Sequence, residues 1–242
     1  MRRSRRSTRA ALYLGLLGLA TQAACADGLA SQLVAAAPAA NPRVLELAAR
    51  AAECARRQGV LDGFRHLAVI DYSLPSTEPR LWVFDLSRHR LLFQELVAHG
   101  RNTGERVAEH FSNIEGSKMS SIGLFQATET YYGSNGYSLR LRGLDPGFND
   151  RALERAIVMH GAPYVSEAIA ERLGRLGRSW GCPALRQEVA RTVIDTLKGG
   201  ALLFAYYPDR KWLAESPYFQ CGDAPAGSQV VASDSDAATT RG

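Results

Sequence analysis

Seven apolar segments rich in β-branched, aromatic and leucine residues constrain the fold of this chain more than any other feature. They cover residues 66–72, 80–86, 90–97, 121–128, 137–142, 156–160 and 201–207. Each is 5 to 8 residues long, which is the usual length of a strand and short for a helix. The polar link Ser87 to His89 is short enough to join two of them as a hairpin. The pattern predicts one β-rich domain.

Three segments are predicted to be helices beside these strands. Asn41-Pro42 supplies a capping side chain followed by proline at the first helical position, and apolar residues at helical spacing continue towards Gly59. Residues 166–173 and 187–198 have helical patterns, and Gly199-Gly200 ends the second. With these helices at its periphery, the domain belongs to the β-rich α+β class.

The rest of the chain divides by composition. Residues 27–60 are predicted to be an Ala-rich, unpatterned lead-in followed by the packing helix, and residues 61–215 the main domain. Residues 216–242 have no core-forming pattern, so we predict a disordered tail. Within the domain, residues 98–120 form a long loop rich in glycine and serine. Loops of this length in compact domains tend to be functional.

Residues 1–26 have the composition of an export signal. Five arginines and no acidic residue accompany an apolar run from Ala10 to Ala20, and small residues at 24–26 offer a cleavage site. The run is about half the length that spans a bilayer, so no stable membrane span is expected. We predict export to the periplasm or cell wall. A lipid anchor on Cys25 and a twin-arginine type of signal are the alternatives.

This N-terminal segment also explains the net charge of +5 at pH 7. The chain has 29 basic and 24 acidic residues, so without the five N-terminal arginines the two signs balance. A neutral domain gives no reason to expect a nucleic-acid partner. We expect a monomer.

The cysteine count predicts one disulfide and one free thiol. After cleavage at Ala26 three cysteines remain, and an odd number leaves one unpaired in an oxidising compartment. We predict that Cys54 pairs with Cys221, which would join the N-terminal helix to the C-terminal end. Cys182 is then free. Three free thiols are the alternative.

The sequence around Cys182 suits a reactive thiol. Cysteine is the strongest common side-chain nucleophile near neutral pH, and it needs a neighbouring base and backbone donors for the oxyanion that it creates. Gly181 lets the backbone turn sharply enough to present amide groups and sulfur together. His160 ends an apolar strand segment upstream and is the candidate base. A buried cysteine and a hydrogen-bonded core histidine are the alternative interpretation.

A zinc site is another possible use of these side chains. It would take as ligands His99, His110, His160 and Cys182. None of them forms a tight C-x-x-C or H-x-x-x-H pair, which argues against zinc. We predict neither a metal nor an organic cofactor.

The other histidines are expected to have structural or solvated positions. His66 begins a strand segment and His89 lies in a turn. His99-Gly100 repeats the dipeptide His160-Gly161 at another strand end. For His99 we favour a hydrogen-bonded loop anchor, with contact to a substrate as the alternative.

Longer motifs surround these residues. They are Pro75-Ser76, RLWVFDL at 80–86, VAHGRNTG at 97–104, FSN at 111–113, SSIGLF at 120–125, ETYYG at 129–133, SLRLRGLD at 138–145 and GRLGRSWGCPAL at 174–185. With these motifs, the chain from His66 to Tyr207 resembles the murein L,D-transpeptidase catalytic domain family. The resemblance implies a β-sandwich of mixed sheets with a few peripheral helices. Trp180 replaces the histidine of the wider superfamily's S-H-G-C, and Ala184 stands where a polar residue is frequent. Both fit a subfamily with S-W-G-C-P-A.

The resemblance also implies a role for each residue of the site. Cys182 corresponds to the nucleophile and His160 to the general base, and the carbonyl of Gly161 would orient the imidazole. The amides of Gly181 and Cys182 would form the oxyanion hole. The loop 98–120 would supply one wall of the substrate groove. The candidate substrate-binding residues are Arg178, Ser179, Trp180, His99, Tyr131 and Tyr132. Arg178 is a candidate for carboxylate binding, with a surface salt bridge as the alternative. Tyr131 and Tyr132 are candidates for the groove walls, with plain packing as the alternative.

In such enzymes the partner is a peptidoglycan tetrapeptide stem, which is transferred through a thioester to form a 3→3 cross-link. We therefore expect an exported cysteine-dependent L,D-transpeptidase. Hydrolysis of the same stems by an L,D-carboxypeptidase or endopeptidase is one alternative, and a non-catalytic wall-binding module is another. A papain-like peptidase is disfavoured because its cysteine precedes its histidine in the chain.

Overall fold

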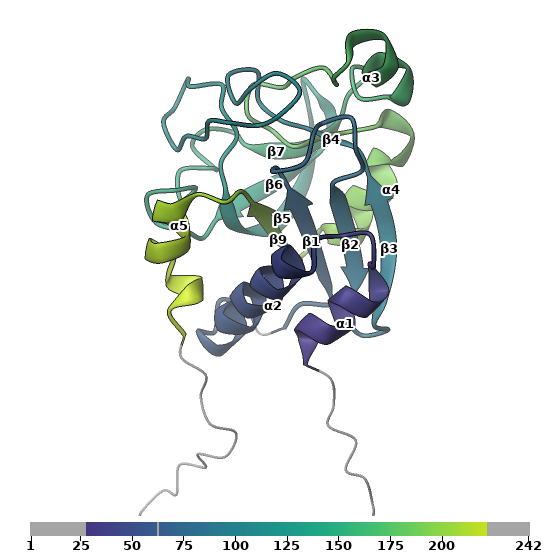
Figure 1. Cartoon of the computed structure of the whole chain (residues 1–242). Helices are drawn as coiled ribbons and strands as arrows, with labels where there is room; N and C mark the ends of the chain where they lie inside the picture. Colours follow the sequence, from purple (N-terminus) through teal and green to yellow (C-terminus); the bar gives the residue numbers. More distant parts are fainter. Residues whose placement is uncertain (1–27, 62, 222–242) are drawn as a thin grey trace, which may run out of the picture.

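The computed structural model describes residues 28–61 and 63–221 (Figure 1). Its centre is one nine-stranded mixed sheet with the order β3-β2-β1-β9-β5-β6-β7-β8-β4. The strands are β1 His66–Asp71, β2 Leu81–Asp85, β3 Arg90–Glu95, β4 Val97–Ala98, β5 Gly123–Gly133, β6 Gly136–Gly143, β7 Val158–Gly161, β8 Ala184–Leu185 and β9 Leu202–Tyr206. The helices are α1 Leu29–Ala36, α2 Pro42–Arg57, α3 Glu167–Leu173, α4 Gln187–Leu197, α5 Arg210–Glu215 and the 3-10 helix η1 Pro217–Phe219.

The sheet curls until its two edges come together. The edge strands β3 and β4 follow each other in the chain with only Leu96 between them. The sheet is therefore nearly closed, like a barrel, and what the sequence suggested as separate sheets is one hydrogen-bonded sheet. Strands β1 and β9 pair in parallel, as do β7 and β8, whereas β1–β2 and β5–β6 are antiparallel. The predicted β-rich α+β class is confirmed.

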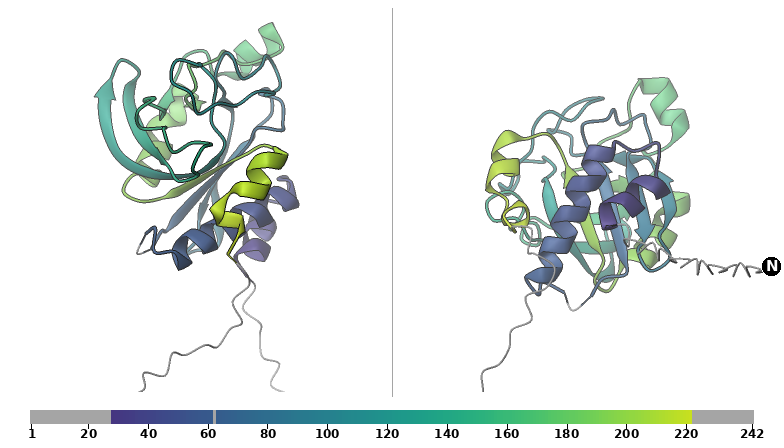
Figure 2. Two further views of the ribbon diagram at one scale, coloured as in Figure 1. Left: turned by 90° about the vertical axis from the view of Figure 1, so that its left-hand side faces the viewer. Right: turned by 60° about the horizontal axis from the view of Figure 1, so that its bottom comes forward.

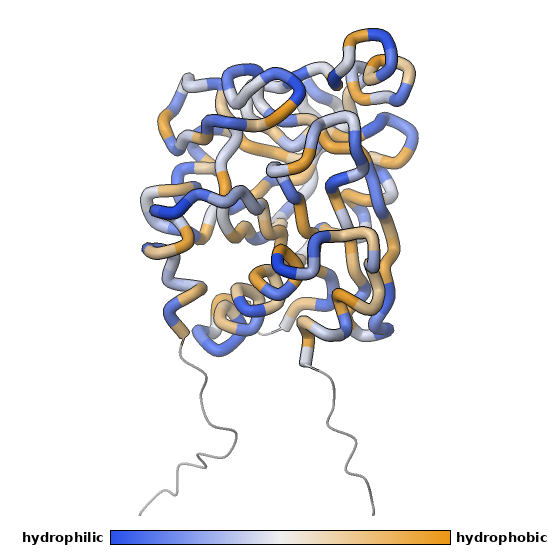
Figure 3. Tube along the Cα trace, in the orientation of Figure 1, coloured by the Kyte–Doolittle hydropathy of each residue, from blue (hydrophilic) through white to orange (hydrophobic). Residues whose placement is uncertain are grey.

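Alternating side chains of the strands build two apolar cores. On β1, Leu67 and Val69 point to the face that α1, α2 and α5 cover, whereas Ala68 and Ile70 point into the curled sheet, where α4 packs. The left view of Figure 2 shows the β5–β6 hairpin arching away from the helices on the covered face. In Figure 3, α2 alternates between hydrophobic and hydrophilic residues along its turns, as expected of a helix with one buried side.

Helical structure begins earlier in the chain than predicted. The side chain of Asn41 accepts a hydrogen bond from the backbone of Arg43 at 2.9 Å, so α2 starts with the expected cap. The segment expected to be an unpatterned lead-in contains α1, whose Leu33 is buried beneath the helices. Eight residues with a single fully buried side chain give too weak a periodicity to be recognised.

The predicted disorder from residue 216 onward is wrong for residues 216–221. Tyr218 and Phe219 are buried, and Phe219 packs edge-on against Trp212 with ring centroids 5.3 Å apart. Cys221 forms a disulfide with Cys54 of α2, the pairing expected from the sequence, with their Cα atoms 5.7 Å apart. Two aromatic residues after a proline show no period, so only the tertiary contact identifies this segment as part of the core. Residues 222–242 lie outside the described part.

The predictions on residues 1–26 concern a segment outside the described residues. In the described ranges 28–61 and 63–221, no helix has both the length and the apolar character to cross a bilayer.

The fold brings the two candidate catalytic residues together through β8. His160 of β7 pairs with Ala184 of β8 on one side and with Ser138 of β6 on the other. Cys182 comes two residues before Ala184, so the strand pairing fixes the separation between the histidine and cysteine backbones. The long loops of this region and α3 lie at the end of the molecule opposite α1 and α2 (Figure 1).

Candidate active site

His160 is held as a neutral base. Its side chain is 4% exposed, and Nδ1 lies 3.0 Å from the carbonyl oxygen of Gly161. Because a carbonyl only accepts, Nδ1 carries the proton and Nε2 keeps its lone pair. Burial lowers the pKa of His160, and the bond to Gly161 partly opposes this effect. The predicted orienting role of the Gly161 carbonyl therefore has the matching geometry.

Cys182 is the free cysteine of the described chain, and its side chain is 8% exposed. The sulfur lies 3.6 Å from the carbonyl oxygen of Ala156 and 3.4 Å from the amide nitrogen of Val158. The thiol therefore donates to the first group and accepts from the second. Burial raises the pKa of Cys182, while the Val158 amide and the positive charge of Arg155 act in the opposite direction.

The two residues face one pocket but do not yet touch. Cys182 and His160 both line a pocket of about 480 Å³. Within the described chain, no hydrogen bond joins Sγ to the imidazole, and the sulfur is held by Ala156 and Val158 instead. Catalytic hydrogen bonds are often loose before substrate binds. Proton transfer requires Sγ to leave Ala156 and turn towards Nε2 of His160.

The turn before the cysteine depends on Ser179 and Gly181. The hydroxyl of Ser179 donates to the Cys182 carbonyl at 2.6 Å and accepts from the Gly181 amide at 3.1 Å. Gly181 has φ of 125°, and an added Cβ would lie 2.7 Å from the carbonyl oxygen of Met119, so only glycine fits. Ser179 is thus a shaping residue, and its hydroxyl is already engaged within the protein.

The predicted oxyanion hole needs a correction. Of its two amides, that of Gly181 is already bonded to Ser179, so it is not open to a substrate. The Cys182 amide has no carbonyl, carboxylate or hydroxyl acceptor in the described chain. The sequence shows that a glycine permits a turn, but it does not show which backbone amide forms a hydrogen bond within that turn.

The predicted groove walls are also partly wrong. The pocket is lined by Ser134 and Asn135, the tip of the β5–β6 hairpin, and not by Tyr131 or Tyr132. Tyr132 is 71% exposed, and its hydroxyl accepts from Arg191 at 2.6 Å. The Tyr131 ring lies under the guanidinium of Arg140, 4.4 Å away. The two strand segments were predicted near these positions, but the residues that line the pocket belong to the turn between them.

Arg178 lines the pocket without being free to bind a carboxylate. Its Nη1 atom lies 2.6 Å from a carboxylate oxygen of Glu105, and it also donates to the carbonyl oxygens of Arg101 and Gly104. Its charge is therefore already paired. The predicted carboxylate-binding role has no support in this geometry.

His99 is the loop anchor that the sequence favoured, and not a group that can contact substrate. It is 1% exposed, and its Nδ1 accepts from the guanidinium of Arg80 at 2.8 Å. Its Nε2 consequently carries the proton and donates to the Gly104 carbonyl at 3.2 Å. Burial, followed by the Arg80 charge, lowers the pKa of His99 to about 4. This histidine has no free nitrogen.

Besides Ser134 and Asn135, sequence reasoning missed three residues in this region. Tyr164 lines the pocket, and Lys118 lies over the indole of Trp180, its Nζ 5.0 Å from the ring centroid. Trp180 lines the pocket and is 72% exposed. The third is Arg155, which acts on the sulfur. Lys118 has φ of 56°, a conformation rare outside glycine, and no sequence signal indicates it.

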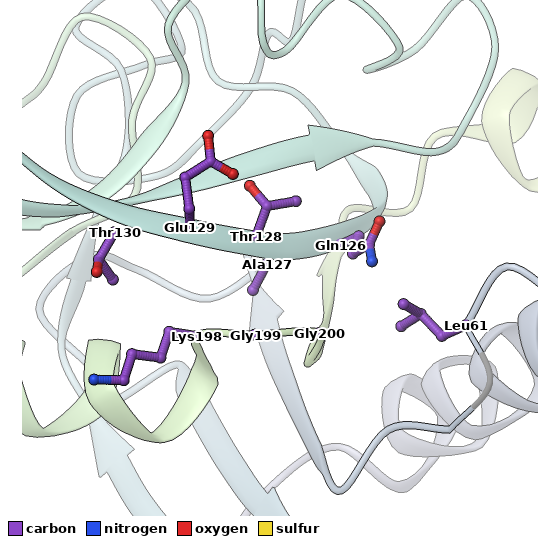
Figure 4. Close-up of a pocket in the computed structure, with 9 residues that line it drawn as sticks. All are labelled: Leu61, Gln126, Ala127, Thr128, Glu129, Thr130, Lys198, Gly199 and Gly200. Carbon is purple, nitrogen blue, oxygen red and sulfur yellow. The ribbon is translucent and has the colours of Figure 1, made fainter.

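A second pocket lies along β5 and has no comparable chemistry. It measures about 550 Å³ and runs between the strand and the end of α4 (Figure 4). Its charged lining residues are Glu129 and Lys198, which are paired with Arg140 and Asp195 respectively. No cysteine or histidine lines it.

The four residues considered as zinc ligands do not assemble. In the described residues, no group of three or more cysteine, histidine, aspartate and glutamate side chains has the arrangement of a metal site. His99 uses both ring nitrogens on protein partners, and His160 uses one.

The chain belongs to the L,D-transpeptidase catalytic domain family, whose model matches residues 36–206. A comparison with curated proteins finds no match. Among solved structures the chain is similar to an L,D-transpeptidase from Mycobacterium smegmatis, with 15% identity, a TM-score of 0.36 and 60% of each chain covered. For an L,D-transpeptidase from Stackebrandtia nassauensis the values are 12%, 0.37 and 68% of each chain.

The helical cell shape determining protein Pgp2 from Campylobacter jejuni is another similar structure, with 14% identity and a TM-score of 0.39. That alignment covers 60% of this chain and 48% of Pgp2. The chain thus spans about 60% of the length of the first solved structures that it matches.

Proposed function

We propose that this protein is an exported L,D-transpeptidase that transfers peptidoglycan tetrapeptide stems through a thioester on Cys182. The observation that carries the proposal is the pairing, in one pocket, of a free thiol with a neutral imidazole whose Nε2 is unprotonated. Membership of the L,D-transpeptidase family supplies the substrate class. Export is supported by the arginine-rich start and by the Cys54–Cys221 disulfide, because disulfides persist in oxidising compartments.

In the first half-reaction, the Cys182 proton passes to Nε2 of His160 as the sulfur attacks the carbonyl carbon of the third stem residue. The carbonyl electron pair moves to oxygen, and the Cys182 amide stabilises this oxyanion. Collapse of the intermediate breaks the C–N bond to the terminal D-alanine. His160 returns its proton to the leaving amine, and the thioester remains.

In the second half-reaction, the amine of a neighbouring stem attacks the thioester and gives its proton to His160. The C–S bond breaks, the stem is now amide-linked to its neighbour, and the thiolate takes the proton back. The result is a 3→3 cross-link. If water replaces the amine, the same steps give a shortened stem.

The test is mass spectrometry of purified tetrapeptide muropeptides after incubation with the wild type and with Cys182→Ala. We expect cross-linked dimers, released D-alanine and an acyl adduct on the Cys182 peptide, with Cys54 and Cys221 unmodified. Cys182→Ala should form none of these. If Cys182→Ala forms cross-links, Cys182 is not the nucleophile. If the wild type is inactive and its Cys182 stays unmodified, the proposed catalytic role is wrong. If the protein forms shortened stems and no cross-links when acceptor stems are present, its reaction is hydrolysis and not transfer.

A further inference from the structure

A half-buried arginine without a counter-ion lies next to the nucleophile. Arg155 donates to the carbonyl oxygens of Ser112 and Met119 and to the hydroxyls of Ser117 and Ser121. All four acceptors are neutral. No salt bridge of the described residues includes this guanidinium, and its Nε is buried with no acceptor among them.

An uncompensated charge away from water is costly, so its presence calls for a partner. Arg178, which lines the pocket of Cys182 and His160, has Glu105 as its partner. For Arg155, the group of opposite charge that the site can generate is the thiolate of Cys182. The positive charge of Arg155 acts to lower the pKa of Cys182, and the thiolate acts to raise the pKa of Arg155, in each case against the larger effect of burial.

The backbone that follows Arg155 contacts the sulfur. Ala156 has φ of 52°, a left-handed conformation that is uncommon for alanine. This turn directs the Ala156 carbonyl to Sγ at 3.6 Å, and the Val158 amide reaches Sγ at 3.4 Å. The same arginine holds the Met119 carbonyl, which lies against Gly181 and so fixes the cysteine turn from the other side.

The tyrosines that act on Cys182 and the imidazole of His160 do not supply a positive charge at neutral pH. The tyrosines that interact with Cys182 are Tyr72 and Tyr164, and burial raises the pKa of each to about 12, so both stay neutral. His160 is neutral until it accepts the thiol proton, since burial lowers its pKa. Among the described groups that act on Cys182, Arg155 is therefore the permanent cation.

We propose that Arg155 is the counter-charge of the Cys182 thiolate and positions the loop 112–121 against the cysteine turn. The proposal rests on the proposed function in one respect, that Cys182 ionises during the reaction. Arg155 touches the loop and acts through the sulfur, so it is a positioning residue and makes no contact with substrate. Its removal is expected to lower kcat more than it changes KM.

The experiment measures the rate of Cys182 alkylation by iodoacetamide against pH, which needs no peptidoglycan. Arg155→Gln should move the midpoint of the profile upward by about one pH unit and slow alkylation at pH 7 about tenfold. Arg155→Lys keeps the charge but loses the four-acceptor geometry, and it should restore most of the rate. Arg151→Gln, which removes an exposed charge paired with Glu154, is the matched control and should leave the midpoint unchanged.

An unchanged midpoint in a folded Arg155→Gln protein would overturn the proposal. So would Arg155→Lys and Arg155→Gln behaving alike, because a role limited to holding the loop depends on hydrogen bonds and not on charge. If Arg155→Gln does not fold, Arg155→Met keeps the apolar stem and serves as the neutral variant. If the variants shift the alkylation midpoint as expected but the wild type does not turn over muropeptides, this inference stands and only the proposed function is overturned.

Discussion

His99-Gly100 and His160-Gly161 lie at the ends of the two strands that flank β8. Ala184 of β8 pairs with Ala98 on one side and with His160 on the other. His99 comes directly after Ala98, and its backbone oxygen accepts from the Ser179 amide at 3.0 Å. The same dipeptide thus borders the segment of Cys182 twice.

The two histidines differ in how many ring nitrogens the protein uses. His99 accepts from Arg80 and donates to Gly104, so its ring is fully bonded. His160 donates to Gly161 and keeps Nε2 free towards the pocket. Burial lowers the pKa of both. The comparison shows that a strand-end histidine becomes a candidate base only where one nitrogen is left over.

The largest expected effect separates the two histidines by activity. His160→Gln should lower kcat by about 10²–10⁴-fold because the proton acceptor is lost, with little change in thermal stability. His99→Gln should retain most of the activity below its unfolding temperature, although it should be less stable. Steady-state kinetics with muropeptides and thermal unfolding of both proteins test this. Equal losses of kcat in two folded variants would contradict the assignment.

The sequence was sufficient for the parts of this comparison that depend on local pattern. Alternation and turn residues located the strands, and the apolar run ending at His160 located the candidate base. The odd number of cysteines indicated that Cys182 is free. These features depend on residues that are close together in the sequence or on simple counts of residue types.

The rest depends on contacts between distant segments. Arg80 reaches His99 only because β2 and β4 are brought together, and the Ala156 carbonyl reaches the sulfur of Cys182 at a turn with positive φ. A positive φ at alanine or lysine has no sequence signature. The use of the Gly181 amide by Ser179 likewise follows from the folded turn, which is why the predicted oxyanion hole needed correction.

The next effect concerns stability in acid. The folded pKa of His99 is about 4, below its ordinary value of 6.5, so the unfolded chain binds a proton between these values that the folded protein does not. Stability is therefore fully present above pH 6.5 and is lost as pH falls towards 4, by on the order of 3 kcal/mol. Urea unfolding at pH 7.5 and pH 5 should show this loss in the wild type.

His99→Gln isolates the contribution of this one histidine, because other buried groups titrate equally in both proteins. Its stability should fall less than that of the wild type between pH 7.5 and pH 5. His89→Gln, at an exposed turn, is the control and should follow the wild type. If His99→Gln shows the full wild-type loss, the buried imidazole is not its source.

The smallest expected effect is the difference in stability between alanine substitutions at Gly100 and at Gly161. A Cβ on residue 100 would lie 2.5 Å from the Lys118 carbonyl oxygen and 2.9 Å from Cα of Gly181, and both are backbone atoms. A Cβ on residue 161 would make one such close contact, at 2.9 Å with the methyl carbon of Ala190, so fewer backbone atoms would have to shift. Gly100→Ala should cost about 1–3 kcal/mol, and Gly161→Ala less.

Because Gly100 lies against Gly181, the first substitution should also slow alkylation of Cys182, whereas the second should not. Gly63→Ala, where nothing lies within 4 Å of the added carbon, controls for the change of residue type. Thermal unfolding and iodoacetamide kinetics measure both consequences. Equal destabilisation by the two substitutions would mean that the Lys118 loop yields as easily as a helix, and the rigid packing inferred around the cysteine turn would be wrong.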